Sequence, residues 1–280
     1  MISELSELDD LRRLARLFTD VWGRGGEPLI SSDTLRALSV SGNYVAGAHV
    51  GDRLVGGLVG WLGGSPPHEL HLHSHILGVV ADSQVRGLGF ELKQHQRRWC
   101  LDRGVKVAEW TFDPLVRRNA YFNLSKLGAE ARQYLVDFYG AMTDGINAGD
   151  ESDRLLVSWR LDSVEAEAAA SGNAESLEVD QLIAKGASPV LSVGNDGRPQ
   201  PHTSSAPTLL CQVPADIVEV RRADPKLAHL WRISVRGAMT HAFDGGYRVS
   251  GFTRSGWYVF EARPKTLGER FGDPDGPRSG

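Results

Sequence analysis

The sequence reads His75-Ile-Leu-Gly-Val-Val-Ala-Asp-Ser-Gln-Val-Arg-Gly-Leu-Gly-Phe-Glu-Leu92 at the point that decides its fold. The apolar residues at its start indicate a buried strand, and those from Leu88 onward continue at helical spacing. Between the two, Gln84-Val-Arg-Gly-Leu-Gly89 forms a glycine-rich turn that points successive backbone N–H groups into one concavity. These donors lie at a helix N-terminus, where the helix dipole also favours an anion. The turn therefore predicts a pyrophosphate site, and close strand–helix packing is its alternative use.

The position of this turn supports the predicted pyrophosphate site more strongly than its amino-acid pattern does. A polar residue with glycine three positions later and glycine or alanine five positions later arises by chance about 0.3 times in a chain this long. The sequence contains one match, and that match falls at the predicted strand-to-helix junction. The junction is therefore the first candidate for a functional site.

The elements around the turn predict an α/β (α+β) fold with a mixed central sheet. Upstream, the pattern predicts a helix at Glu4–Val21 and a second helix from Ser32. It then predicts a β-hairpin of Tyr44–Val50 with Leu54–Leu62, and a strand at His71–Val80. Downstream it predicts helices at Leu88–Leu101 and Arg117–Leu127. It predicts strands at Val105–Phe112, Glu130–Tyr134 and Arg154–Leu161. A strand–helix–strand crossover makes its two strands parallel neighbours, whereas hairpins add antiparallel edges. The sheet is therefore expected to be mixed.

The chain changes character after residue 161. Residues 162–188 are rich in Ala, Glu and Ser and are interpreted as a linker between a first domain, 1–161, and a smaller α/β unit, 189–262. The tail, 263–280, is rich in Gly, Pro and charge and is expected to be flexible. In the smaller unit, Cys211-Gln-Val-Pro-Ala-Asp echoes Gly78-Val-Val-Ala-Asp. We therefore interpret the unit as a degenerate half-repeat that lacks the phosphate turn, and that forms a wall of the substrate cleft or a dimer contact.

Composition excludes several classes of protein. A net charge of −4 argues against a nucleic-acid surface, which usually has a basic excess. Only two cysteines occur, Cys100 and Cys211, without metal-ligand spacing, which fits a reducing compartment. The start of the chain does not read as a signal peptide, and no apolar run approaches the ~20 residues of a membrane span. These features predict a cytoplasmic protein that binds neither membranes nor nucleic acid.

Here the chain resembles the GNAT (GCN5-related) N-acetyltransferase superfamily. The quoted stretch is similar to the fourth strand, pyrophosphate loop and third helix of that family, and Lys126-Leu-Gly128 to the end of its fourth helix. The resemblance covers about residues 4–161. It is nearest to a branch of predicted GNAT proteins that share three motifs: Trp110-Thr-Phe-Asp-Pro-Leu, Asn119-Ala-x-Phe-Asn and Trp231-Arg-x-x-x-Arg.

The resemblance implies a GNAT acyl-CoA-binding fold, with acetyl-CoA or another acyl-CoA as co-substrate. It implies that the strand before the turn diverges from its neighbour, with Val79 and Val80 beside the thioester and a backbone N–H stabilising the oxyanion. The implied phosphate donors are the turn residues Gln84, Val85, Arg86, Gly87, Leu88 and Gly89. Asn119 and Asn123 follow the next strand at i,i+4 spacing, so both are expected to face the pantetheine arm.

One position departs from the family pattern. Many GNAT proteins place a tyrosine in the fourth helix as the acid that protonates the leaving thiolate, and Leu124 stands there in this chain. The acid is then either absent, which a good leaving group tolerates, or supplied elsewhere. Tyr121 is the first candidate, with Tyr134 and Tyr139 as alternatives.

Three histidines form the candidate base. His71, His73 and His75 alternate, so on a strand they would share one face with Val79. Histone acetyltransferases of the family carry a glutamate base at the position of His73. A histidine base predicts an ascending pH limb at roughly 6–7. Packing roles are the alternative, and a zinc site is disfavoured because the ligands would spread over about 13 Å, so no metal is predicted.

Other charged residues are candidates for substrate contacts. Asp113 ends a predicted strand and either binds a substrate amine or is a solvated turn residue. His229, Arg232 and Arg236 form a basic stripe on a predicted helix, which is either a solvated face or a carboxylate-binding surface.

Together these features predict an N-acyltransferase. It would transfer an acetyl group, or a larger one such as succinyl, from CoA to a primary amine of a small molecule or amino acid. The alternatives are a non-catalytic acyl-CoA-binding protein, and a GNAT-like O- or S-acyl enzyme or decarboxylase. The expected partner is the small-molecule amine, and a homodimer is a further hypothesis.

Overall fold

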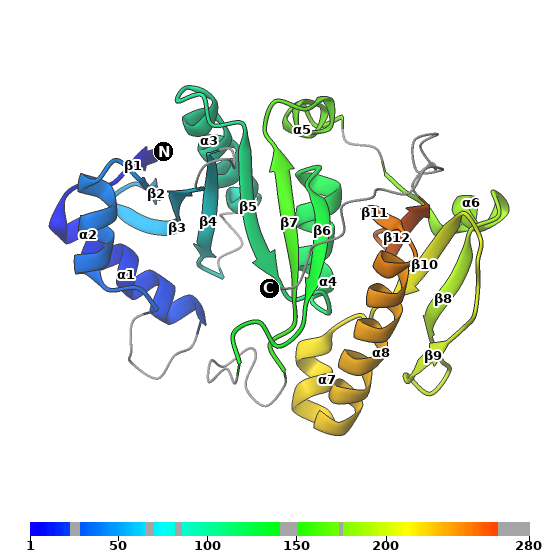
Figure 1. Cartoon of the computed structure of the whole chain (residues 1–280). Helices are drawn as coiled ribbons and strands as arrows, with labels where there is room; N and C mark the ends of the chain where they lie inside the picture. Colours follow the sequence, from blue (N-terminus) through cyan, green and yellow to red (C-terminus); the bar gives the residue numbers. More distant parts are fainter. Residues whose placement is uncertain (23–28, 65–69, 82–85, 141–150, 174–175, 263–280) are drawn as a thin grey trace, which may run out of the picture.

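The computed structural model describes residues 1–22, 29–64, 70–81, 86–140, 151–173 and 176–262. In these ranges all strands belong to one twelve-stranded sheet, in the order β1-β2-β3-β4-β5-β7-β6-β11-β12-β10-β8-β9 (Figure 1). The pairs β4–β5 and β10–β8 are parallel, and the other neighbours are antiparallel. The predicted mixed sheet in an α/β fold is therefore confirmed.

The first part of the chain builds one edge of the sheet. Its elements are β1 (Ile2–Glu4), α1 (Leu8–Trp22), α2 (Ser32–Val40), β2 (Tyr44–Val50), β3 (Arg53–Gly63) and β4 (His71–Val79). The hairpin β2–β3 is confirmed, and α2 begins after Ser31, whose side chain accepts from the N–H of Thr34. The helix predicted from Glu4 begins instead at Leu8, because the residues before it pair with β2 as an edge strand.

The middle of the chain supplies the centre of the sheet. Its elements are α3 (Leu88–Leu101), β5 (Val107–Phe112), α4 (Arg117–Ala120), η2 (Tyr121–Lys126), β6 (Glu130–Leu135) and β7 (Arg154–Arg160). The helix predicted at 117–127 is thus a short α-helix that continues as a π-helix. Its i→i+5 bond runs from the N–H of Leu127 to the carbonyl of Phe122, at 3.0 Å.

The last part extends the same sheet. Its elements are α5 (Val164–Ala170), α6 (Val179–Ala184), β8 (Ser188–Val193), β9 (Pro199–Pro201), β10 (Thr208–Gln212), α7 (Ile217–Ala223), α8 (Pro225–Asp244), β11 (Tyr247–Phe252) and β12 (Trp257–Ala262). The segment interpreted as a linker contains α5 and α6. The strand order does not support a half-repeat, because β12 separates β10 from β11, whereas β4 and β5 are adjacent.

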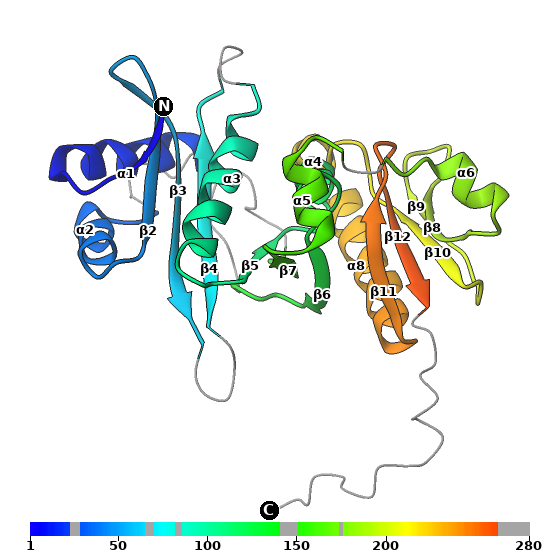
Figure 2. The ribbon, with the colours of Figure 1, turned by 90° about the horizontal axis from the view of Figure 1, so that it is seen from above.

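Among the described residues there are three hydrophobic clusters, and the two larger ones hold these layers together. The smaller lies between the sheet and the helices α1 and α2, where Phe18 and Leu14 are buried. Gly78 permits this packing, since a Cβ there would meet the Phe18 ring at 2.8 Å. The larger core runs without interruption from Leu72 and Trp110 to Trp231 on α8. Figure 2 shows α8 beside β11, whose Val249 pairs with Ala131 of β6. The C-terminal elements thus share a core with the centre of the sheet.

Candidate active site

A β-bulge reshapes β4 at the predicted histidine face. Val59 of β3 pairs with Ile76, but the next residue, Gly60, pairs with Ser74, so His75 is an extra residue in β4. His75 and Ile76 therefore lie on the same face of the sheet, and the alternation shifts by one position beyond them. The three histidines share a face as predicted. Val79 does not lie with them, because the bulge moves it to the α3 side.

Past the bulge, β4 diverges from β5. In the described part of the chain their parallel ladder pairs Leu72 with Ala108 and His73 with Glu109, whereas β4 continues to Val79. Figure 1 shows the two ribbons separating below this point. The strand edge from Ser74 to Val79 is therefore free of pairing with β5, and the gap has a closed end at His73.

The backbone of Val79 faces this gap. The N–H of Val80 donates to the carbonyl of Val55 in β3, at 3.0 Å. Backbone groups alternate between the two edges of an antiparallel strand, so Val79 and Leu77 point theirs away from β3. Of the two valines predicted beside the thioester, Val79 thus presents its N–H to the gap. Val80 donates its N–H to β3 within the sheet.

The glycine turn lies at the open end of the gap and begins α3. Gly87 has φ 83°, a left-handed conformation that glycine adopts readily, and no side chain caps the helix after it. The first-turn N–H groups of Phe90 and Glu91 bond to the carbonyl of Gly87. Those of Leu88 and Gly89 precede them and are the donors that a helix N-terminus offers to an anion. Gln84 and Val85 lie outside the described residues, and Arg86 is exposed.

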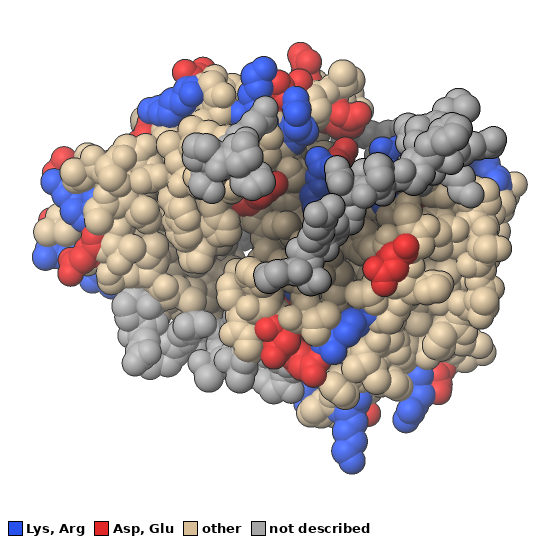
Figure 3. Space-filling view, viewed as in Figure 1, with Lys and Arg blue, Asp and Glu red and all other residues tan. Residues whose placement is uncertain are grey.

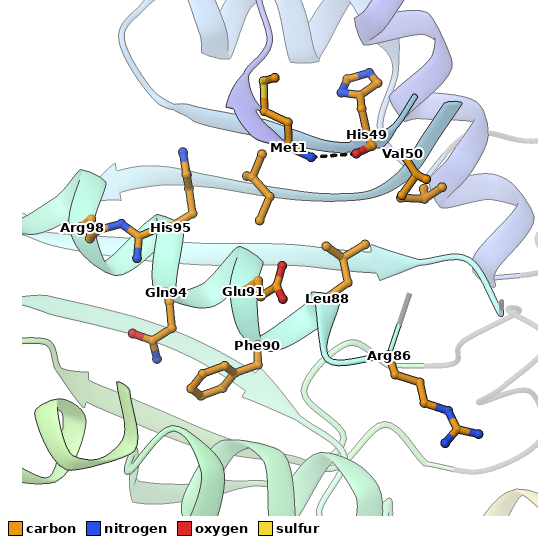
Figure 4. A pocket seen from close by; sticks show the side chains of 12 residues that line it. Met1, His49, Val50, Arg86, Leu88, Phe90, Glu91, Gln94, His95 and Arg98 are labelled. Atoms are coloured by element: carbon orange, nitrogen blue, oxygen red, sulfur yellow. Dashed lines mark hydrogen bonds between the residues drawn. The ribbon is translucent and has the colours of Figure 1, made fainter. Parts of the chain in front are cut away.

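A pocket of about 460 Å³ flanks the same helix on the side of β1–β3. Figure 4 shows Arg86 and Leu88 at the N-terminal end of α3, with Met1, His49 and Val50 across the pocket. The pocket shares Arg86 and Leu88 with the turn. Because β3 and β4 separate the edge strands from β5, it lies on the other flank of α3 from the gap.

An aromatic and acidic cluster lies on the opposite face, at the closed end of the gap. The Trp61 ring lies 4.9 Å from that of His73 and 4.5 Å from that of His75, and the two imidazoles are 5.7 Å apart. Glu109 pairs with His73 in the ladder, and its Oε2 lies 3.9 Å from Nε2 of His71. Sequence reasoning missed Trp61 and Glu109, which only strand pairing brings to the histidines.

Burial changes the acid–base properties of these histidines. It lowers the pKa of His73 to about 4, with smaller contributions from the charges of His75, His71 and Lys93. Burial also lowers the pKa of His75. Both imidazoles are therefore neutral at physiological pH and can accept a proton, but the lowered pKa makes His73 a weaker base than a solvated imidazole. The expected pH limb at 6–7 is wrong for His73, because that value assumed a solvated imidazole.

A comparison of pH profiles tests this property. We expect kcat/KM of His73→Gln to fall by about two orders of magnitude if His73 takes the amine proton. Because His73 is already neutral, the ratio of wild-type to variant kcat/KM should stay constant between about pH 5.5 and pH 8. A ratio that rises with a midpoint near 6.5 would contradict the lowered pKa. Equal activity of the two proteins would remove His73 as the base and favour Glu109 or a water relay.

The two asparagines predicted along the pantetheine arm differ in burial. Asn123 is buried, and its Oδ1 accepts from Nε1 of Trp110 at 3.3 Å, whereas Asn119 is half-buried. Asn119 lies in α4 and Asn123 in the π-helix, and their predicted contact with a pantetheine arm stays a prediction. Tyr121 faces the C-terminal elements, and its hydroxyl accepts from Nε of Arg254 at 2.9 Å. Leu124 is packed in the larger core.

The structure brings Asp113 and Arg232 together. Both are buried, and Arg232 donates to the two carboxylate oxygens at 2.8 and 2.9 Å. Arg221 of α7 donates to Oδ2 at 2.6 Å, and Oδ1 also accepts from the N–H of Leu115. Burial by itself would raise the pKa of Asp113, but the arginines outweigh it and hold that pKa well below its usual range. A substrate role for Asp113 or Arg232 would require this pair to open.

Arg236, the second arginine of the basic stripe, is also engaged within the chain. Arg236 donates to both carboxylate oxygens of Asp153, at 2.9 and 2.8 Å, and pairs with Glu151. Asp153 accepts a further bond of 2.6 Å from the hydroxyl of Tyr134. His229 is exposed on the same helix. The carboxylates that Arg232 and Arg236 bind in this structure are thus the protein's own, and their predicted contact with substrate stays a prediction.

Other features of the structure limit the kind of chemistry that the site can perform. Burial raises the pKa of the Cys100 thiol to about 12, which does not suit a nucleophile. Within the described ranges, no three potential metal ligands among His, Cys, Asp and Glu gather closely enough to hold an ion. None of the helices described combines the length and apolarity needed to cross a bilayer. On the face in Figure 3, acidic and basic side chains are interspersed and lie mainly around the rim.

Comparisons with known proteins find likeness in structure only. No family model matches the sequence, and no curated protein matches it. The ribosomal-protein-S18-alanine N-acetyltransferase from Escherichia coli is 17% identical over 59% of this chain and 95% of its own, with a TM-score of 0.44. Aminoglycoside 6'-acetyltransferase type Ii is 15% identical over 58% and 98%, also with a TM-score of 0.44. A putative GNAT-family acetyltransferase from Desulfovibrio desulfuricans is 16% identical over 57% and 98%, with a TM-score of 0.43.

Proposed function

We propose that this chain is an acyl-CoA-dependent N-acyltransferase of the GNAT superfamily, acting on a primary amine of a small molecule or amino acid. The observation that carries the proposal is the gap between β4 and β5, whose open end meets a helix N-terminus without a side-chain cap. An extended molecule with amide groups along its length and a pyrophosphate at one end matches both features. Acyl-CoA has this combination.

The residues present fit such a ligand. Leu77 and Val79 offer backbone groups that pair with no other described strand and are of the kind that pair with the amides of a pantetheine arm. Leu88 and Gly89 offer N–H groups to the pyrophosphate, and exposed Arg86 adds a guanidinium for phosphate. Acyl-CoA would then place its thioester toward the closed end of the gap, beside the bulge at His75.

The reaction follows from the groups around that point. The amine would approach from the face of Trp61 and Glu109, with Glu109 holding the ammonium and neutral His73 or His75 taking its proton. Its nitrogen would attack the acyl carbon, and a backbone N–H in the gap, such as that of Val79, would stabilise the charge on the acyl oxygen. An amide forms, and the thiolate of CoA leaves. No nucleophile from the protein is needed.

One observation favours a second candidate function. Leu124, at the position where many family members carry the acid, is buried in the core, and the alternative acid Tyr121 is bonded to Arg254. A protein that binds acyl-CoA without turnover would need no acid. A thiol-release assay over a panel of amines separates the two functions, since only the enzyme frees CoA in an amine-dependent way.

Substitution of Gly87 tests the binding site. We expect Gly87→Asp to abolish CoA binding in calorimetry, because it places a carboxylate where the pyrophosphate would lie. A left-handed aspartate also costs about 1 kcal/mol of conformational strain. Gly42→Asp is the matched control, because Gly42 has φ 79° and, like Gly87, has no atom of the described residues within 4 Å of an added Cβ. Equal CoA affinity in both variants would remove the turn from the site.

A further inference from the structure

A buried lysine that the proposed reaction does not use lies near the closed end of the gap. Lys93 of α3 is 3% exposed. Its Nζ donates to Oγ of Ser74 at 2.7 Å and to Oε1 of Gln96 at 3.3 Å, and it lies 3.6 Å from the centre of the Trp110 ring. Ser74 is the first residue of β4 beyond the last pair with β5, and Trp110 follows Glu109, the last residue of β5 that pairs with β4. Lys93 thus bridges the two strands where they begin to separate.

The polar groups around Lys93 contain more donors than acceptors. The ion pairs among the described residues include no carboxylate for Lys93, whose partners are a hydroxyl, an amide oxygen and an aromatic ring. Gln96 is fully buried, its Oε1 also accepts from Ser74, and its Nε2 has no hydrogen-bond partner among the described residues. Burial lowers the pKa of Lys93 to about 7. Buried donors without acceptors are rare, so the cluster is suited to an acceptor that carries negative charge.

The position of the cluster identifies the part of a ligand it would meet. Ser74 points to the α3 face of the sheet, and the histidines point to the opposite face, where the amine is proposed to bind. A group at the end of the gap on the α3 side is therefore separated from the acceptor amine by the strands. In an acyl-CoA whose thioester lies at the bulge, this group is the far end of the acyl chain.

We propose that Lys93 and Gln96 form a recognition site for the terminal carboxylate of a dicarboxylic acyl group, of the size of malonyl, succinyl or glutaryl. This inference rests on the proposed function and names its acyl donor. One carboxylate supplies two acceptor oxygens, one for Nζ of Lys93 and one for Nε2 of Gln96, and neutralises the ammonium. A neutral acyl chain would leave both donors unsatisfied, so the site discriminates against it.

Binding of acyl-CoA esters tests the site without knowledge of the amine. Calorimetry on the full chain would measure Kd for CoA and for three matched pairs of esters: malonyl with propionyl, succinyl with butyryl, and glutaryl with valeryl. Within a pair the carbon number is equal, and only the terminal carboxylate differs. We expect at least one acidic ester to bind about 100-fold more tightly than its neutral partner. Lys93→Met should remove that preference, and Lys185→Met, an exposed lysine of the last part of the chain, should keep it.

Each outcome has one meaning. No preference for any acidic ester in the wild-type protein overturns the carboxylate site, and this result needs no variant to fold. If Lys93→Met loses affinity for acidic and neutral esters equally, Lys93 has a structural role and the proposal also fails. Gln96→Met is a second variant for the same comparison, should Lys93→Met prove unstable. CoA separates the two proposals: if CoA itself does not bind to the wild-type chain, the proposed function fails and not only this site.

Discussion

A chain that ends at residue 186 is expected to be insoluble, or folded too poorly to bind CoA. The larger core is shared between the centre of the sheet and the C-terminal elements, among them Trp231, Val235 and Phe260. Each large buried side chain contributes about 1.5–3 kcal/mol, and a whole domain is stable by only about 5–15 kcal/mol. The truncation would also leave Asp113 buried without Arg232 or Arg221. The free energy lost with several such contacts therefore exceeds the free energy of unfolding of a whole domain.

The comparison protein for this experiment is a chain that ends after Ala262, which keeps every described element. Soluble yield, sedimentation and the urea-unfolding transition would be measured for both chains, with CoA binding by calorimetry. A monomeric fragment of residues 1–186 that unfolds cooperatively and binds CoA would refute the shared core. The C-terminal elements would then be an independent addition to the fold.

Asp113→Ala is expected to destabilise the protein by about 3–5 kcal/mol, because it removes a buried carboxylate that binds two buried guanidinium groups. Asp113 and Arg232 are 5% and 1% exposed, so solvent does not compensate for the lost partner. The matched control is Asp162→Ala, which removes an exposed partner of Lys106 and Arg160 and should change the free energy of unfolding much less than Asp113→Ala. Urea unfolding measures both losses. A loss below about 1 kcal/mol for Asp113→Ala would show that the arginines reach water or other acceptors.

The same carboxylate gives stability a defined pH dependence. The pKa of Asp113 is lower in the folded protein than in the unfolded chain, so its contribution is fully present above the unfolded value of about 4. That contribution is lost as the pH falls further toward the folded pKa, because the unfolded state then binds the proton first. Asp113→Ala should therefore reduce the slope of unfolding free energy against pH below about 4.

Local patterns in the sequence predicted the local elements well. The helix α3 runs from Leu88 to Leu101 as predicted, since its apolar spacing and its glycine start are both local signals. The bulge at His75 could not be predicted, because the alternating histidines read as a regular strand and the register is decided by β3. The pair of Asp113 and Arg232 joins residues that are 119 positions apart, and neither position carries a local sign of its partner.

The candidate site was predictable only where it depends on one segment. The turn at Gly87 was found from its sequence motif, whereas Glu109 and Trp61 lie beside the histidines only because of strand pairing. Lys93 did leave a signal in the sequence. It precedes Gln96 by three positions and Cys100 by seven, so it lies on a buried stripe of the helix, where a lysine is out of place.

The two outermost strands of the sheet have a bearing on how the protein associates. β1 and β9 are three residues long, and two of the three residues in β9 are Pro199 and Pro201. Short edges and prolines, which lack an N–H, deny an approaching strand the row of hydrogen bonds that it would need. A sheet of twelve strands thus ends on both sides in borders that resist polymerisation. We expect a dimer of this chain to form through its helical faces rather than by continuing the sheet.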